Sequence, residues 1–119
     1  MNIDELMDRK VFVVCGDTVN PQKYAYRIKE ALIADGHSVY AVGKELGSLD
    51  EVGEKIEVLD LCIRADRGYE LIKAYNGDIG AVIIQPGAGS PQIEALLDER
   101  GIPWLNGCVL RALEAKGRL

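Results

Sequence analysis

The strongest constraint on the fold of this chain is a run of five apolar residues that ends at a glycine. Residues 11–15 read V-F-V-V-C, and Gly16 follows them. A continuous apolar run rich in β-branched residues is typical of a strand that is buried on both faces of a parallel sheet. This segment therefore predicts a buried parallel strand that stops where the chain can turn.

Further strands and helices follow in alternation. The sequence predicts strands at residues 38–42, 58–63, 81–85 and 103–105, and helices at about 22–35, 66–75, 90–101 and 107–116. Ser90 and Pro91 are typical of a helix start, and Gly36 and Gly101 are typical of helix ends. Residues 43–57 have no clear period, so we expect them to form mainly a loop.

Strands that alternate with helices form parallel sheets with helices on both faces. The predicted fold is therefore a single α/β domain over residues 1–119, Rossmann-like and three-layered, with five parallel strands in the order 3-2-1-4-5. A chain of 119 residues, 48% of them hydrophobic, is long enough to fold without a metal or a disulfide.

The composition argues against several classes of protein. The net charge is −5 and no basic stripe exists, which argues against nucleic-acid binding. No run of about 18 apolar residues is present, and residues 1–8 are acidic where a signal peptide is basic. The three cysteines, Cys15, Cys62 and Cys108, form an odd number without metal-binding spacing, which is typical of a reduced cytoplasm. We therefore expect a cytoplasmic protein that binds neither nucleic acid nor membranes.

The candidate ligand site follows from the predicted sheet. Ligands of open parallel sheets bind at the carboxyl ends of the strands, beside the point where the strand order reverses. The segments that directly follow the five strands are Gly16-Asp17-Thr18, Gly43-Lys44, Ile63-Arg64, Gln85-Pro86-Gly87 and Asn106-Gly107-Cys108.

The first two of these segments bear on the type of ligand. The turn after the first strand lacks a G-x-G-x-x-G fingerprint, so Gly16 either lets backbone N–H groups approach a phosphate or only turns the chain. An NAD site has an acid at the end of the second strand, whereas this chain has Lys44. A lysine there suits a phosphorylated ribose, as in coenzyme A or NADP, unless it is only a solvated loop residue.

Several segments together resemble a known family. They are N-P-Q-K-Y-A-Y-R-I at residues 20–28, V-Y-A-V-G-K at 39–44, V-L-D-L-C-I-R at 58–64, V-I-I-Q-P-G at 82–87 and N-G-C at 106–108. In order and spacing they resemble the small coenzyme A-binding proteins of Rossmann type, which are related to the coenzyme A-binding domain of succinyl-CoA synthetase α subunits. The resemblance extends over residues 10–113.

The resemblance implies a binding site for coenzyme A or an acyl-CoA. The pyrophosphate would meet the 16–18 segment and Lys23, and the adenosine with its 3′-phosphate would meet Gly43 and Lys44. Ile63 and Arg64 would cover the adenine, residues 85–87 would border the pantetheine arm, and residues 106–108 would lie near the thiol. The chain departs from the family at Asp17, at Gly43-Lys44 and at Asn106-Gly107.

Catalytic groups are not evident in the sequence. The ligase chemistry of succinyl-CoA synthetase needs a phosphorylated histidine, but the single histidine, His37, is predicted at the amino edge of the sheet. Cys108 is predicted to start a helix, a position that favours a reactive thiolate, or else it is a packing residue. We find no Ser-His-Asp set, metal cluster or phosphate-binding P-loop.

The sequence thus predicts non-covalent binding of coenzyme A or acyl-CoA without catalysis. One alternative is an NAD(P)-binding Rossmann protein or a fragment of an oxidoreductase. Another is a ligand-controlled interaction module or homodimer, which an exposed apolar patch formed by Val109, Leu110 and Leu113 would favour.

Overall fold

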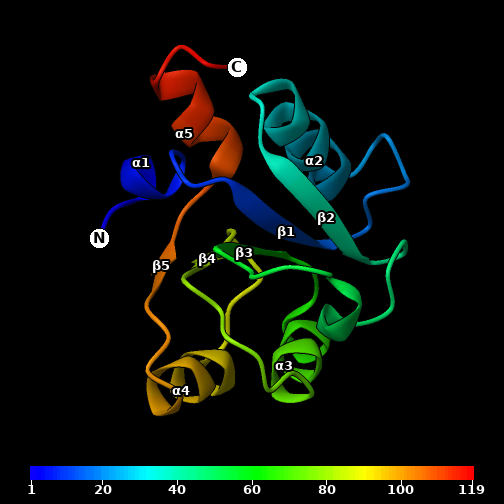
Figure 1. The fold of residues 1–119 in the computed structure, drawn as a ribbon, viewed down its shortest axis with the longest axis vertical. Helices are drawn as coiled ribbons and strands as arrows, with labels where there is room; N and C mark the ends of the chain where they lie inside the picture. Colours follow the sequence, from blue (N-terminus) through cyan, green and yellow to red (C-terminus); the bar gives the residue numbers. More distant parts are fainter.

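The sheet consists of five parallel strands. The computed structural model describes residues 1–119. The strands are β1 (Val11–Gly16), β2 (Ser38–Gly43), β3 (Val58–Cys62), β4 (Val82–Ile84) and β5 (Trp104–Asn106). They lie in the order β2-β1-β3-β4-β5, and every neighbouring pair is parallel (Figure 1). The predicted α/β class and the five parallel strands are confirmed.

The position of β3 differs from the predicted strand order. The order 3-2-1-4-5 assigns the third strand to an edge beside the second, whereas β3 pairs with both β1 and β4. The burial of the two strands explains this arrangement. Four of the five residues of β3 are buried, so it needs neighbours on both sides, while only two of six in β2 are buried, which suits an edge.

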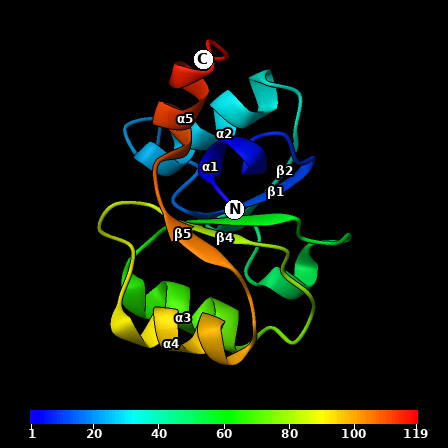
Figure 2. The same ribbon diagram turned by 90° about the vertical axis from the view of Figure 1, so that its left-hand side faces the viewer.

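Helices cover both faces of the sheet, as predicted. The helices α1 (Ile3–Leu6), α2 (Tyr24–Ala34) and α5 (Val109–Ala115) lie on one face. The other face carries α3 (Ala65–Lys73), α4 (Pro91–Glu99) and the short 3-10 helix η1 (Leu49–Glu51) (Figure 2). No helix combines the length and the apolar character that crossing a membrane requires.

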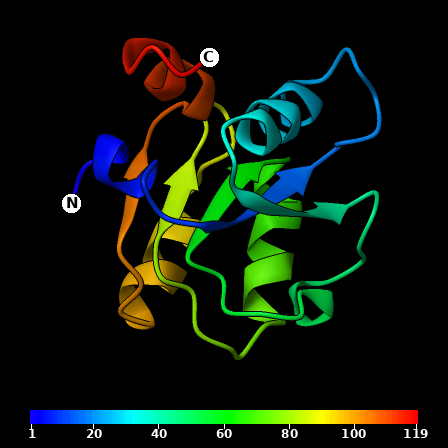
Figure 3. The ribbon, with the colours of Figure 1, turned by 45° about the horizontal axis from the view of Figure 1, so that its top comes forward.

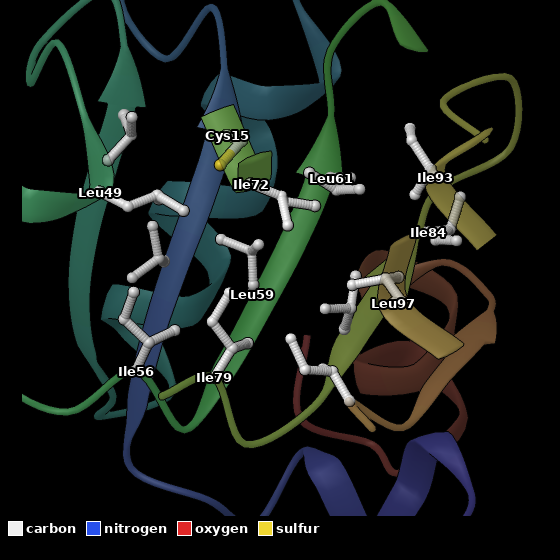
Figure 4. Close-up of a cluster of buried hydrophobic side chains, with 14 of the residues drawn as sticks. Cys15, Leu49, Ile56, Leu59, Leu61, Ile72, Ile79, Ile84, Ile93 and Leu97 are labelled. Atoms are coloured by element: carbon white, nitrogen blue, oxygen red, sulfur yellow. The ribbon is translucent and has the colours of Figure 1, made fainter. Parts of the chain in front are cut away.

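Two hydrophobic clusters hold these layers together. The cluster under α3 and α4 contains 16 buried residues, among them Cys15 and Leu59 from the sheet and Ile72 and Leu97 from the helices (Figure 4). The second cluster, of 14 buried residues, joins the sheet to α1, α2 and α5. Cys15 is therefore a packing residue, as its place in a strand predicted.

The apolar side of α5 belongs to this second cluster. Val109 and Leu113 are fully buried, and Leu110 is 8% exposed. The exposed patch that would favour an interaction module or a dimer therefore does not exist, because these side chains pack against the protein's own sheet.

The strand order places the switch point between β1 and β3. The chain leaves β1 for α2 on one face, and it leaves β3 for α3 on the opposite face. The ends of the two strands are adjacent, since Gly16 pairs with Cys62. Figure 3 shows β3 and β4 running toward the space between α2 and α5. Ligands of doubly wound sheets bind at such a place.

Candidate functional site

Gly16 allows α2 to begin close to the end of β3. A Cβ atom at this position would lie 2.4 Å from the Cys62 carbonyl oxygen and 2.7 Å from the Ala25 Cβ. No side chain fits into such a space. The glycine therefore sets the distance between the first turn of α2 and the carboxyl end of the sheet.

Asp17 organises the loop that leads from β1 to α2. Its Oδ1 accepts hydrogen bonds from the N–H groups of Val19, at 3.2 Å, and Asn20, at 3.1 Å. The Asn20 N–H contributes most to lowering the pKa of this carboxyl, with smaller contributions from the Val19 N–H, Lys44 and Lys23. Asp17 is thus an ionised group of the loop, and the Val19 and Asn20 N–H groups are not free for a phosphate.

Thr18 makes a different contact from the one that the resemblance implies. It is only 1% exposed, and its hydroxyl donates to Glu45 Oε2 at 2.6 Å. Lys29 Nζ lies 2.7 Å from the same oxygen. These hydrogen bonds lower the pKa of Glu45, and the bond from Lys29 contributes more than the bond from Thr18 does. Sequence reasoning did not select Glu45, although an acid so soon after the second strand is a signal for a ribose site.

The N-terminus of α2 has no side-chain cap. Lys23 occupies the N-cap position without a capping hydrogen bond, and the first turn contains no acid. By contrast, Ser90 caps α4, with its hydroxyl oxygen accepting from the Ile93 N–H at 3.1 Å. The first N–H groups of α2 therefore have no partner in the protein, and the helix dipole and Lys23 make this end attractive to an anion.

Two of the other predicted site residues, Ile63 and Arg64, follow the end of β3, but their side chains make contacts on the α3 side. The side chain of Arg64 is 80% exposed and pairs with Asp66, with its Nη2 donating to Asp66 Oδ2 at 2.8 Å. Ile63 packs against the cluster on the α3 side. Lys44 is exposed beside the loop of Asp17.

A cavity of about 700 Å³ lies between α2 and α5, above the ends of β3 and β4. Its lining consists of Tyr24, Arg27, Cys62, Gln85, Pro86, Gly107, Cys108, Leu110, Arg111, Glu114 and Leu119. This volume lies within the usual range for small-molecule sites.

Four predicted site residues line this cavity: Gln85, Pro86, Gly107 and Cys108. The ten that do not line it are Gly16, Asp17, Thr18, Lys23, Gly43, Lys44, Ile63, Arg64, Gly87 and Asn106. Apart from Lys23, the predicted site residues all came from segments that follow strands, so sequence reasoning missed the side chains of the two helices. Tyr24 and Arg27 are three residues apart, a spacing that places both on one side of α2.

Gln85 is the polar group at the floor of the cavity. It is 5% exposed, and its Oε1 accepts from the Val109 N–H at 2.9 Å. The only buried side-chain polar atoms without a partner are the two carboxyl oxygens of Asp60. Since Gln85 lines the cavity and its NH₂ group donates to no protein oxygen, this group faces the cavity.

Two thiols also line the cavity. Burial, followed by the nearby Asp60 and Cys108, raises the pKa of Cys62 to about 12. Cys108 is the N-cap residue of α5, as predicted, but α5 has only seven residues and the Val109 N–H already bonds to Gln85. The helix end alone therefore does not make Cys108 reactive. No three acidic, histidine or cysteine side chains gather to hold a metal ion.

This arrangement agrees with a sequence comparison. The family model of the CoA binding domain matches residues 10–114. The chain belongs to this family. No curated protein matches it.

Solved structures show that the fold of this CoA-binding domain also occurs in other proteins. A redesigned binding protein, titled "Prb (PH1109 protein redesigned for binding)", has 24% identity and a TM-score of 0.82, over 95% of this chain and 88% of that one. A Thermus thermophilus protein has 24% identity and a TM-score of 0.75 over all of both chains. A conserved hypothetical protein from Pyrococcus furiosus has 24% identity and a TM-score of 0.71, over 89% of this chain and 98% of that one.

Proposed function

We propose that the protein binds coenzyme A or an acyl-CoA non-covalently at the carboxyl edge of the sheet. The observation that carries this proposal is the continuity between the uncapped start of α2 and the cavity. Tyr24 and Arg27 belong to the first turns of α2 and also line the cavity. A ligand with an anionic group at the helix start can therefore extend a neutral arm into the cavity.

The parts of coenzyme A match the parts of this site. The pyrophosphate suits the free N–H groups of α2 together with Lys23 and Arg27. The adenosine would extend toward β2, where Lys44 is available for the 3′-phosphate. The pantetheine arm suits the walls formed by Pro86 and Leu110, and its thiol end would lie near Cys108. The free state of all three cysteines fits the reducing cytoplasm, where we place the protein.

Ligand-dependent thermal unfolding tests this function. Coenzyme A at a tenfold excess over its Kd is expected to stabilise the protein by ~1.4 kcal/mol and to raise the Tm. Pantetheine, which lacks the phosphates, should give a smaller shift because it cannot use the start of α2. Absence of any shift with coenzyme A and with acetyl-CoA contradicts the proposal.

A second candidate ligand is NAD, and Glu45 is the observation that favours it. Both Thr18 and Lys29 bond to its Oε2, which leaves Oε1 able to accept from a ribose hydroxyl. If NAD is the ligand, NAD should raise the Tm more than coenzyme A does. Glu45→Gln should then weaken NAD and leave coenzyme A unchanged.

Lys44→Ala is expected to weaken coenzyme A by about three- to tenfold at low salt, because an exposed lysine on a phosphate makes a screened contact. Dephospho-coenzyme A, which lacks the 3′-phosphate, should bind both proteins alike. Calorimetric titration measures both affinities, and Lys55→Ala, a change at another exposed loop lysine, is the control. If the affinities for both ligands fall equally, Lys44 instead orders the loop or contacts the pyrophosphate.

Asp17→Asn is expected to strengthen coenzyme A binding by about two- to tenfold, because it removes a negative charge near the phosphates. The amide oxygen can still accept from Val19 and Asn20, so the loop should keep its shape. The affinity for pantetheine should stay the same. Weaker binding of coenzyme A to this variant would show that the carboxylate itself orders the site.

A further inference from the structure

The floor of the cavity combines a sulfur with a hydrogen-bond donor. The Gln85 Oε1 is 2.9 Å from the N–H of Val109, the residue that follows Cys108. This bond fixes the carboxamide against the start of α5, and it also fixes which end of the amide is the oxygen, since an N–H can bond only to an acceptor. The NH₂ group, with no acceptor in the protein, is left facing the same cavity that Cys108 lines.

A donor that faces the cavity without a partner in the protein is available to a ligand acceptor. Gln85 is 5% exposed, and its NH₂ group is not among the buried polar atoms that lack a partner, so this group is reached from the cavity. If the thiol end of an acyl-CoA enters the cavity, the atom that it brings is the thioester carbonyl oxygen, which is an acceptor. A donor aimed at such an oxygen stabilises the negative charge that develops there when a nucleophile attacks the carbonyl carbon.

We propose that the cavity floor is a site of thioester exchange, at which Cys108 takes the acyl group of a bound acyl-CoA and Gln85 donates to the carbonyl oxygen. The inference rests on the proposed binding of acyl-CoA. Cys108 gives its proton to solvent, and its sulfur forms a bond to the carbonyl carbon. The bond between that carbon and the coenzyme A sulfur then breaks, and the leaving thiolate takes up a proton. One thioester replaces another, so no further reactant is required.

The other two cysteines do not compete for the acyl group. Cys62 lines the same cavity, but with a pKa of about 12 it stays protonated at neutral pH, and the thiolate is the nucleophile. Cys15 is fully buried on the opposite side of the sheet, in the cluster under α3. The arrangement thus selects one of three thiols.

The experiment is acylation of the protein by acetyl-CoA, followed with time by peptide mapping after an acid quench. Acyl groups should appear on Cys108 and be released by hydroxylamine, while Cys62 and Cys15 stay free. The rate should exceed that of N-acetylcysteine at equal concentration by at least ~tenfold, because a bound thioester is held beside the sulfur. Cys108→Ser should abolish the hydroxylamine-sensitive label.

Gln85→Glu tests the donor. The glutamate keeps an oxygen for the Val109 N–H, and in its ionised form, which the assay reaches at raised pH, it has no hydrogen to donate. Acylation should slow by about a hundredfold, as it does when one donor to an oxyanion is lost. Gln92→Glu, the same change at an exposed position of α4, should acylate at the wild-type rate. Thermal unfolding checks that both variants fold.

The outcomes separate this inference from the proposed function. Thermal stabilisation by coenzyme A without acylation of Cys108 overturns the exchange site and leaves the binding function intact. Acylation spread over all three cysteines, or no faster than that of N-acetylcysteine, also overturns it. Equal rates in Gln85→Glu and Gln92→Glu overturn the role of Gln85. If coenzyme A and acetyl-CoA give no stabilisation, the binding function fails, and the exchange site fails with it.

Discussion

Gly16→Ala is expected to lower the free energy of unfolding by about 3 kcal/mol, the upper part of the usual range for an overpacked site. The new Cβ would lie 2.4 Å from the Cys62 carbonyl oxygen and 2.7 Å from the Ala25 Cβ. The first neighbour is backbone of a central strand and the second belongs to the buried side of α2. Neither can move without separating β1 from β3 or lifting α2 from the sheet.

The matched control is Gly53→Ala, which adds the same methyl group where no atom lies within 4 Å. Its backbone does not have the positive φ of the turn glycines, so the alanine should be neutral or slightly stabilising. Chemical denaturation of the three proteins measures the difference. If Gly16→Ala and the wild type were equally stable, β1 and β3, or α2 and the sheet, could move apart with little loss of free energy.

The same substitution connects the fold to the site. Because Gly16 sets the distance between α2 and the sheet, the start of α2 should shift in any Gly16→Ala protein that still folds. The N–H groups at that start are those that we propose for the pyrophosphate, so the affinity for coenzyme A should fall together with the stability. A variant that loses stability but binds coenzyme A normally would argue against the use of this helix end.

The class of fold was predictable because it depends on local patterns. The continuous apolar runs of β1 and β3, the Ser90-Pro91 helix start and the glycine stops are all readable within a few residues. The strand order was not predictable in this way, because it depends on comparing the burial of two strands that are far apart in the chain. The polar start of β2 at Ser38 was the available sign that this strand, rather than β3, forms an edge.

The site residues that lie at strand ends were predictable from the sequence. Those whose role depends on a contact between residues far apart in the chain were not. Gln85 and Cys108 follow strands and line the cavity, as the rule for open sheets predicts. The rule cannot show that the Thr18 hydroxyl donates to Glu45, 27 residues away. Because of this hydrogen bond, the hydroxyl is not available to donate to a ligand. Nor can the rule show which side of α5 faces inward, which decides that Arg111 lines the cavity.

Asp60 shows a different limit of sequence reasoning. A carboxyl group inside a strand usually bonds to a neighbouring loop or helix, but Asp60 is fully buried and neither of its oxygens has a partner. Burial raises its pKa well above the ordinary value. Burial therefore favours the neutral form of this carboxyl, which lies between Val14 of β1 and Ile83 of β4.

The contribution of Asp60 to the stability of the protein should consequently fall as the pH rises above ~4, where the carboxyl in the unfolded chain ionises. Over that range the folded state binds one more proton at Asp60 than the unfolded state does. Each pH unit then lowers the contribution of this group by ~1.4 kcal/mol, until the pH reaches the pKa in the folded state. Below pH ~4 both states are protonated and the contribution is constant.

Asp60→Asn removes this dependence because an amide does not titrate in the same range. At pH ~4 the variant should be less stable than the wild type, since it buries two N–H donors that have no acceptor there. As the pH rises above ~4, the wild type should lose stability relative to the variant by up to ~1.4 kcal/mol per pH unit, until the pH passes the pKa of Asp60 in the folded state. Asp78→Asn, at an exposed position, is the control and should run parallel to the wild type.

Urea denaturation of the three proteins at several pH values measures this effect. The difference in the free energy of unfolding between two of the proteins cancels the titration of all other groups. A difference between wild type and Asp60→Asn that stays constant from pH 5 to 7 would show that Asp60 has the same charge in both states. In that case the folded protein provides a partner for the Asp60 carboxylate.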